Sequence, residues 1–542
     1  MIIHEDAPEI NNFRIFSSKF KEILCFYRDV CCGGSMKFLS ISMGHICPDR
    51  RISCTEIRLQ EEKHMNPILY TPKFHGSGYA DVTEDVSIPD YIPEVRRIVG
   101  VRANPTVDGK YMAGDALEID GNVTYTVLYV GGDGGLSQLS QTTPYTGRIP
   151  VQEDVPAHVI TASANAEQIN CRVTGPRKLT LSSRVKLNAM AQGETDASVK
   201  IPDRSHVRRK TGSCTTASLI EVRGSGEASG EIREKEGTKL IMASAELAVS
   251  DVRLGSPAGR ITIKGDVYLT ALSVTPDGVC VTSRSRAPVE ETLPLPEEAD
   301  TASSRAAAFG SVVLIEVDAG DDGVMQWRTE YDIDCAVMKI AESEITADAY
   351  TVGWEDEMAV ENTDCCTPAG CVNGRLTTSA TAGLRPGMTC ICGWGTVTGE
   401  KCAIRGGKMV VEGTVKLECV SAGNGETVTD EVQIPLKYEC DAVPGAEDCE
   451  NLTAKVKAAV TEVTVRPEGD TLNLTAELAI AAAALGKKSV SYVSCVTGKS
   501  PVNEKKNLLR VYIPDPGETA WEVEKRFRLK DEAKMEGKAY VV

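Results

Sequence analysis

The sequence predicts a mainly β protein, built of three tandem β-sandwich-like repeats followed by a small β-α-β module. Two observations carry this prediction. Apolar and polar residues alternate over several long segments, which is typical of strands with one face in a core and one in water. Two of these segments then recur three times at nearly constant spacing, which indicates a repeated domain.

The first recurring segment is an alternating strand with one glycine on its apolar face. It runs from Leu117 to Val130 around Gly121, and it returns around Gly265 and around Gly413. A glycine inside a strand often marks a bulge or the close approach of another backbone. Three glycines at one register therefore predict a tertiary requirement that the three copies share.

The second recurring segment is a strand whose first apolar residue follows the glycine by 58, 60 and 59 residues in the three copies. Such even spacing favours three copies of one domain. Its apolar residues are Leu179, Leu181, Val185 and Leu187 in copy one, Met325, Trp327, Tyr331, Ile333 and Cys335 in copy two, and Leu472, Leu474, Leu478 and Ile480 in copy three.

Residues 1–64 differ from the rest, because they hold five cysteines and no clear periodicity. Gln60-Glu61-Glu62 can be encoded by a purine-rich run like those that precede bacterial start codons. We therefore expect translation to begin at Met65 and treat residues 1–64 as a non-native or disordered leader. The alternative is a genuine cysteine-rich leader.

Hydrophilic stretches at residues 193–216 and 348–364 are expected to be exposed linkers between the copies. Turn-forming glycine and aspartate residues also follow the interrupted strand in each copy, which predicts hairpins at residues 131–135, 275–278 and 423–426. The expected domains are residues 65–215 (repeat one), 216–350 (repeat two), 351–504 (repeat three) and 505–542 (the terminal module).

The terminal module is expected to consist of a strand, a turn, a short helix and a closing strand. Trp521 and Phe527 lie six residues apart on the expected helix, so they cannot share one face. We expect one ring to pack on the strands and the other to be available to a partner. The expected bounds are 508–513 for the first strand, 514–517 for the turn, 518–529 for the helix and 537–542 for the closing strand.

Composition excludes several classes of function. The net charge of −18 argues against nucleic-acid binding, and no apolar run is long enough to span a membrane. The common catalytic motifs are missing, and the histidines of the strand-rich body are isolated. We therefore expect no catalytic, cofactor-binding or metal-binding residues and no enzymatic activity.

The 19 cysteines are odd in number and scattered, which favours synthesis in a reduced compartment. A dense group lacks the paired C-x-x-C spacing of structural zinc sites, so we favour core or surface thiols over metal ligands. Oxidative crosslinking after assembly is a third possibility. The group consists of Cys365, Cys366, Cys371, Cys390, Cys392 and Cys402.

Three segments of copy one, Asp85–Val95, Ile119–Val130 and Pro176–Leu187, closely resemble the SPOCS domain of clostridial spore-coat morphogenetic proteins. Copies two and three resemble it more weakly. The tail is similar to a LysM module in its turn, its helix and its closing strand. It departs from the LysM pattern at Glu518, at Ala520, at Glu524 and in the second helix, which is mostly missing.

This resemblance implies a non-enzymatic protein of the endospore coat that is made in the mother-cell cytoplasm and attaches coat components to the forespore surface. It implies a spore-coat basement-layer protein as the partner of the tail, with other coat proteins as further candidates. The tentative partner-binding residues are Tyr512, Pro516, Gly517, Thr519, Trp521 and Phe527.

Two alternatives stay open. A cell-wall protein could bind peptidoglycan through the LysM-like tail, although the departures from the LysM pattern favour a protein partner over glycan. A secreted adhesin built of β-sandwich repeats is weakened by the missing export signal.

Overall fold

A computed structural model describes residues 67–541 except 152–158, 202–205, 256, 321, 424–425, 447–449, 503–510, 531, 533 and 537–538, together with two short strands nearer the N-terminus. The chain divides into two compact units, Met1–Asn66 and Pro67–Val542. In the first unit, β1 (Phe16–Ser17) pairs with β2 (Ile23–Leu24). The expected start at Met65 and the nature of residues 1–64 lie outside the described residues.

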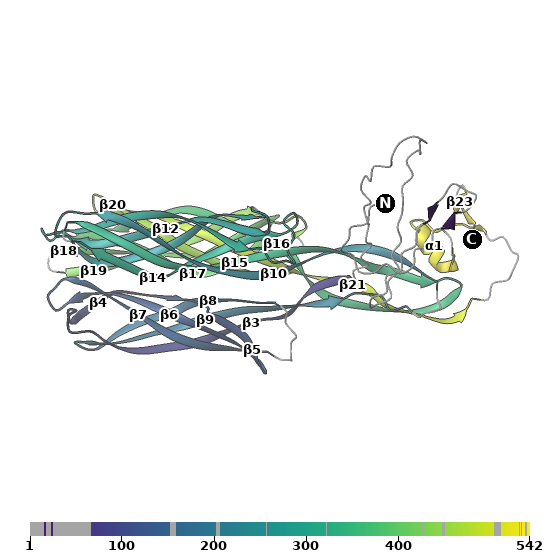
Figure 1. The fold of residues 1–542 in the computed structure, drawn as a ribbon, viewed down its shortest axis with the longest axis horizontal. Coiled ribbons are helices and arrows are strands. Elements are labelled where there is room, and N and C mark those ends of the chain that lie inside the picture. The colour runs from purple at the N-terminus through teal and green to yellow at the C-terminus, as the bar shows by residue number, and fades with distance from the viewer. Residues whose placement is uncertain are drawn as a thin grey trace, which may run out of the picture. The chain divides into compact units, whose positions relative to one another are not determined.

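The second unit is mainly β, as predicted, and its strands pair in antiparallel sheets (Figure 1). In copy one, the first strand pairs with the last, which also pairs with the strand before it, and the remaining four strands form a second sheet. One sheet is β3 (Ile68–Ser87), β9 (Lys178–Asp196) and β8 (Val159–Gly175). The other is β4 (Val95–Pro105), β5 (Gly109–Ala113), β6 (Ala116–Gly131) and β7 (Leu136–Pro150).

Copies two and three repeat this topology, with the first strand again beside the last. Copy two consists of β10 (Val207–Arg233), β15 (Val324–Thr351) and β14 (Arg305–Ala319), with β11 (Lys239–Leu254), β12 (Arg260–Val274) and β13 (Cys280–Pro294). Copy three consists of β16 (Trp354–Gly383), β21 (Thr471–Pro501) and β20 (Glu450–Glu468), with β17 (Thr389–Arg405), β18 (Lys408–Gly423) and β19 (Glu426–Asp441).

Each copy encloses its own apolar core between its two sheets. In copy one, Leu117 and Val123 of one sheet lie in the same core as Leu181 and Val185 of the other. The apolar residues predicted for the second recurring strand are buried in all three copies. The alternation in the sequence therefore marks the inward faces of three β-sandwiches.

The three strand glycines share the structural role that their register predicts. At each one, the register of the preceding strand is interrupted: by the break between β4 and β5, by a bulge in β11 and by a bulge in β17. The displaced strand presses a carbonyl oxygen toward the glycine. A Cβ would lie 1.9 Å from Thr106 O at Gly121, 2.5 Å from Ala248 O at Gly265 and 3.2 Å from Thr398 O at Gly413.

Most of the two hydrophilic stretches predicted to be exposed linkers belongs to strands, so that interpretation is wrong for those residues. Among the described residues, only 197–201 and 206 of the first stretch and 352–353 of the second lie between the named strands. Val207–Thr216 belongs to β10 and pairs with β15, and Trp354–Asp364 belongs to β16 and pairs with β21. Both stretches are polar because paired strands satisfy their backbone groups while leaving many side chains in water. The domain boundaries themselves stay predictions.

The extended strands bring the three copies together in shared apolar clusters. One cluster combines residues from all three copies: Tyr70 and Met190 from copy one, Leu219, Phe309 and Met338 from copy two, and Cys366 and Leu485 from copy three. Apolar burial of this kind is the dominant favourable contribution to association. The copies are therefore packed on one another.

Two hairpin predictions are confirmed by hydrogen bonds that close the turns, from Gly131 N to Gly135 O and from Gly278 N to Thr275 O. The third turn lies partly outside the described residues, although Gly423 pairs with Glu426 across it. No helix among the described residues is long and apolar enough to cross a membrane.

Candidate partner surface of the C-terminal module

The helix of the terminal module begins and ends where its sequence allows good caps. α1 (Ala520–Phe527) follows Thr519, whose side chain accepts a hydrogen bond from the Glu522 amide while the Glu522 carboxylate accepts one from the Thr519 amide. This reciprocal capping box stabilises the first turn. Gly517, at φ +92°, supplies the left-handed turn that leads into the helix.

A small sheet covers the helix, and it is larger than the sequence indicates. The predicted first and closing strands are present as β22 (Val511–Tyr512) and β24 (Ala539–Val541), and they pair with each other. A third strand, β23 (Lys534–Glu536), pairs with the other side of β24. Three residues are too few to show a periodicity, which explains why this strand was not predicted.

Trp521 packs outside its own module, on the long strand β15. Its ring centroid lies 5.2 Å from that of Tyr350, and its indole N–H donates to Asp348 Oδ2 at 2.8 Å. The Tyr350 hydroxyl in turn donates to the carbonyl oxygen of Leu529 at 2.7 Å. Trp521 therefore anchors the helix to copy two.

Ion pairs surround this aromatic contact. Glu524, which is buried, lies 3.0 Å from Arg208 of β10, and Arg528 lies 2.7 Å from Asp356 of β16. Burial alone would raise the pKa of Asp348, but hydrogen bonds from Lys525 and Trp521 outweigh burial and hold that pKa below its usual value. The terminal module is thus joined to two of the three copies.

Phe527 points to the other side, toward its own sheet. Its ring meets Tyr512 edge-on at a centroid distance of 5.1 Å, and the guanidinium of Arg526 stacks on Tyr512 at 5.2 Å. The Tyr512 hydroxyl donates to Glu518 Oε2 at 2.7 Å, which raises the pKa of Tyr512. Phe527 and Tyr512 thus pack on each other inside the module.

The six tentative partner-binding residues therefore divide into three groups. Tyr512 and Phe527 pack together, Trp521 faces copy two, and the exposed Pro516, Gly517 and Thr519 form the turn and cap at the helix start. The prediction that these residues bind a partner stays a prediction. The geometry leaves Pro516, Gly517 and Thr519 as the most accessible of the six.

Sequence reasoning missed two exposed apolar residues beside this turn. Val511 and Ile513 are 62% and 73% exposed. Val511 lies on β22, an edge strand of the small sheet, and Ile513 directly follows that strand. The sequence predicts a strand over residues 508–513, but it does not show that Val511 and Ile513 face outward. We call Val511, Ile513, Pro516 and Gly517 the edge patch.

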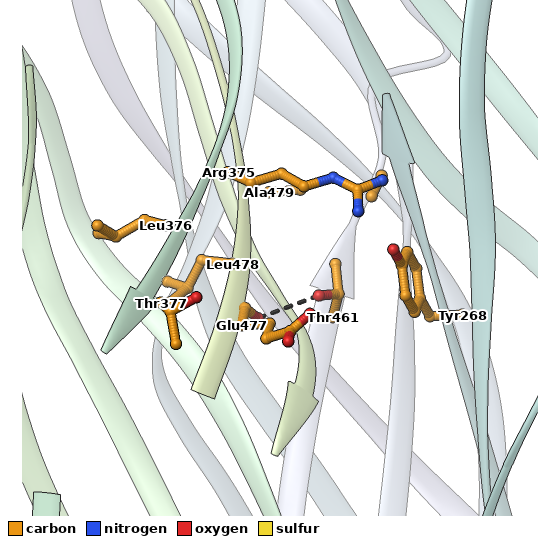
Figure 2. A pocket seen from close by; sticks show the side chains of 9 residues that line it. Tyr268, Arg375, Leu376, Thr377, Thr461, Glu477, Leu478 and Ala479 are labelled. Carbon is orange, nitrogen blue, oxygen red and sulfur yellow. Dashed lines mark hydrogen bonds between the residues drawn. The ribbon is translucent and has the colours of Figure 1, made fainter. Parts of the chain in front are cut away.

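A second place of interest is a cavity of about 220 Å³ between copies two and three (Figure 2). Arg375 of copy three extends beside Tyr268 of copy two, and it donates to Asp266 at 2.9 Å. Ligand pockets usually measure about 300–1,000 Å³. The size and the interface ion pair favour a packing gap at this interface over a ligand site.

Partly buried charged side chains also pair with one another where the three copies meet. Lys455 of copy three lies 2.9 Å from Glu221 and 3.3 Å from Asp334, both of copy two, and Lys110 of copy one also pairs with Glu221. Buried charges are tolerated when they are paired in this way, and removing one partner is costly. We call these four residues the charged seam.

Fold and site together define a class of protein: a β-sandwich repeat protein with a terminal module docked on its long strands. Residues 94–174 match the family model described as SipL, SPOCS domain, so copy one contains a SPOCS domain. This domain supports a sporulation-related protein. No curated protein matches the chain, and no solved structure matches its fold. The similarity of the tail to LysM modules stays a prediction.

Proposed function

We propose that the chain is a non-enzymatic assembly protein of the endospore coat, which tethers coat components to the forespore surface through protein–protein contacts. In this proposal it is made in the mother-cell cytoplasm and then joins the forespore surface. The SPOCS match in copy one is the observation that carries the proposal.

The edge patch supports a protein partner for the tail. Val511 presents apolar surface on a strand at the edge of a sheet, and Ile513 adds to that surface directly after the strand ends. An edge strand can accept an extended segment of another chain through backbone hydrogen bonds, and flanking apolar residues add specificity. The expected partner is a coat protein of the basement layer, as the resemblance implies.

The test places aspartate at Val511 and Ile513 together in a fluorescent fusion expressed in sporulating cells. A carboxylate on each residue should oppose burial at an interface without disturbing a core, because both side chains are exposed. We expect the double variant to lose its enrichment at the forespore surface. Deletion of residues 508–542 should have the same effect.

The matched control is Val279→Asp, because Val279 is 58% exposed and lies in copy two, far along the chain from the module. It should localise normally. Normal localisation of the Val511/Ile513 variant would refute the role of the edge patch. Tight, tail-dependent sedimentation with purified peptidoglycan would instead support the cell-wall alternative.

A further inference from the structure

Two pairs of thiols lie in contact, and both involve copy three. Cys390 of β17 and Cys419 of β18 have their Sγ atoms 3.0 Å apart. Cys214 of β10 and Cys365 of β16 are both buried and belong to one small apolar cluster. We propose that these are two disulfide-forming pairs, which close when the protein meets a low-molecular-weight disulfide such as oxidised glutathione.

The first pair joins neighbouring strands of one sheet. A bulge between Cys390 and Cys392 shifts the register of the two strands. Cys390 therefore pairs with Ser421, and Cys419 lies two residues before Ser421 on β18. Diagonal neighbours of this kind are within reach of each other's side chains. A disulfide needs an S–S distance of about 2.05 Å, so the sulfurs have to approach by roughly 1 Å.

The second pair joins two copies. Cys214 is in the first strand of copy two, and Cys365 is in the first strand of copy three. Both are surrounded by apolar residues that include Leu69 of copy one and Tyr492 of copy three. A bond between them closes a loop of about 150 residues, and long loops give the larger entropic stabilisation in the chain-entropy model. This bond would fix copy three to copy two covalently.

Within each pair, one sulfur is the better nucleophile. The hydrogen bond from Cys365 lowers the pKa of Cys214, and the hydrogen bond from Cys419 lowers the pKa of Cys390. The same hydrogen bonds, together with burial, raise the pKa values of Cys365 and Cys419. Thiolates react and thiols do not, so Cys214 and Cys390 start the exchange.

The reaction balances as two thiol–disulfide exchanges. The Cys390 thiolate attacks one sulfur of oxidised glutathione, which forms a mixed disulfide and releases one glutathione thiolate. The Cys419 thiol then loses its proton and attacks the Cys390 sulfur, which releases the second glutathione. Two protein thiols are oxidised, and one glutathione disulfide is reduced to two thiols. Cys214 and Cys365 react in the same way.

The chain provides a matched control for each pair. Cys366 follows Cys365 directly, but its side chain points to the other face, where it accepts a hydrogen bond from Gln192. Cys392 is two residues from Cys390, is buried and lies in a different apolar cluster. We therefore expect no disulfide between Cys366 and Cys214. We also expect none between Cys392 and Cys419.

The experiment treats reduced full-length protein with oxidised glutathione and identifies linked peptides by mass spectrometry without reduction. We expect Cys214–Cys365 and Cys390–Cys419 links in the unmodified chain. The first should disappear in Cys365→Ser and persist in Cys366→Ser, and the second should disappear in Cys419→Ser and persist in Cys392→Ser. The half-buried Cys390 should react faster than the buried Cys214.

A second readout uses only the unmodified chain, so it does not depend on whether a variant folds. The oxidised protein should melt several degrees higher than the reduced protein, and dithiothreitol should reverse the shift. Linked peptides spread evenly over many cysteine combinations would overturn the proposal. So would mixed glutathione adducts at Cys214 and Cys390 that never resolve into internal bonds.

Discussion

Gly121 offers a quantitative test of the sandwich architecture. A Cβ at this position would lie 1.9 Å from Thr106 O and 2.8 Å from the Tyr145 hydroxyl, which itself donates to Thr106 O at 2.7 Å. Gly121→Ala must therefore move the chain between β4 and β5, or break this hydrogen bond. Overpacking costs about 1–3 kcal/mol, and the hydrogen bond contributes about 1 kcal/mol.

These costs are partly offset, because alanine loses less backbone entropy than glycine on folding, by about 0.5–1 kcal/mol. The net destabilisation of copy one should be about 1–3.5 kcal/mol. Hydrogen exchange followed by mass spectrometry measures it best, because it reports the opening of residues 117–130 separately from the other copies. A single unfolding free energy is poorly defined for a chain with three cores.

The equivalent glycine-to-alanine variants in the other two copies should be destabilised in the order that the same distances predict. Gly265→Ala should cost less than Gly121→Ala, and Gly413→Ala should be nearly neutral, because the nearest carbonyl oxygens are 2.5 and 3.2 Å away. Gly109→Ala is the control, since its nearest neighbour is 3.8 Å away. Faster exchange in Gly413→Ala than in Gly121→Ala would refute the packing argument.

Three further predictions concern the strands and the charges. Limited proteolysis should spare Trp354–Asp364, whose backbone is paired with β21, and early cleavage there would contradict the strand assignment. Burial raises the pKa of Glu400 to about 7, so the carboxyl contributes stability at low pH that is lost as the pH rises through 7. The opening free energy of copy three, measured by hydrogen exchange, should fall between pH 5 and 8 by up to roughly 3 kcal/mol, and by less in Glu400→Gln. Lys455→Met should destabilise by about 1–3 kcal/mol in the same assay, because Glu221 and Asp334 keep Lys110 and Arg223 as partners, whereas the exposed Lys499→Met should cost less than about 1 kcal/mol.

The sequence was sufficient to predict the two recurring strands and the repeat. Alternation around Gly121, Gly265 and Gly413 reports which residues face a core, and a constant spacing reports that the copies share a fold. Neither signal says which strands pair. The sequence therefore predicts a linker over the polar stretch Val207–Thr216, because the pairing of this stretch with β15 depends on residues more than a hundred positions away.

The same limit applies to the terminal module. Its helix could be predicted because the cap at Thr519 and the acidic first turn are local features. The contact of Trp521 with Tyr350 could not, because it joins residues that are distant in the chain and that no periodicity connects. The exposure of Val511 and Ile513 could not be predicted either, because the sequence of a single strand does not show which of its faces a neighbouring element covers.

The most direct test of the proposed coat function is the time and place at which the protein accumulates. A fluorescent fusion of the full chain, expressed from its own promoter, should appear in the mother cell only during sporulation and then surround the forespore. Accumulation in the wall of vegetative cells would contradict the proposal.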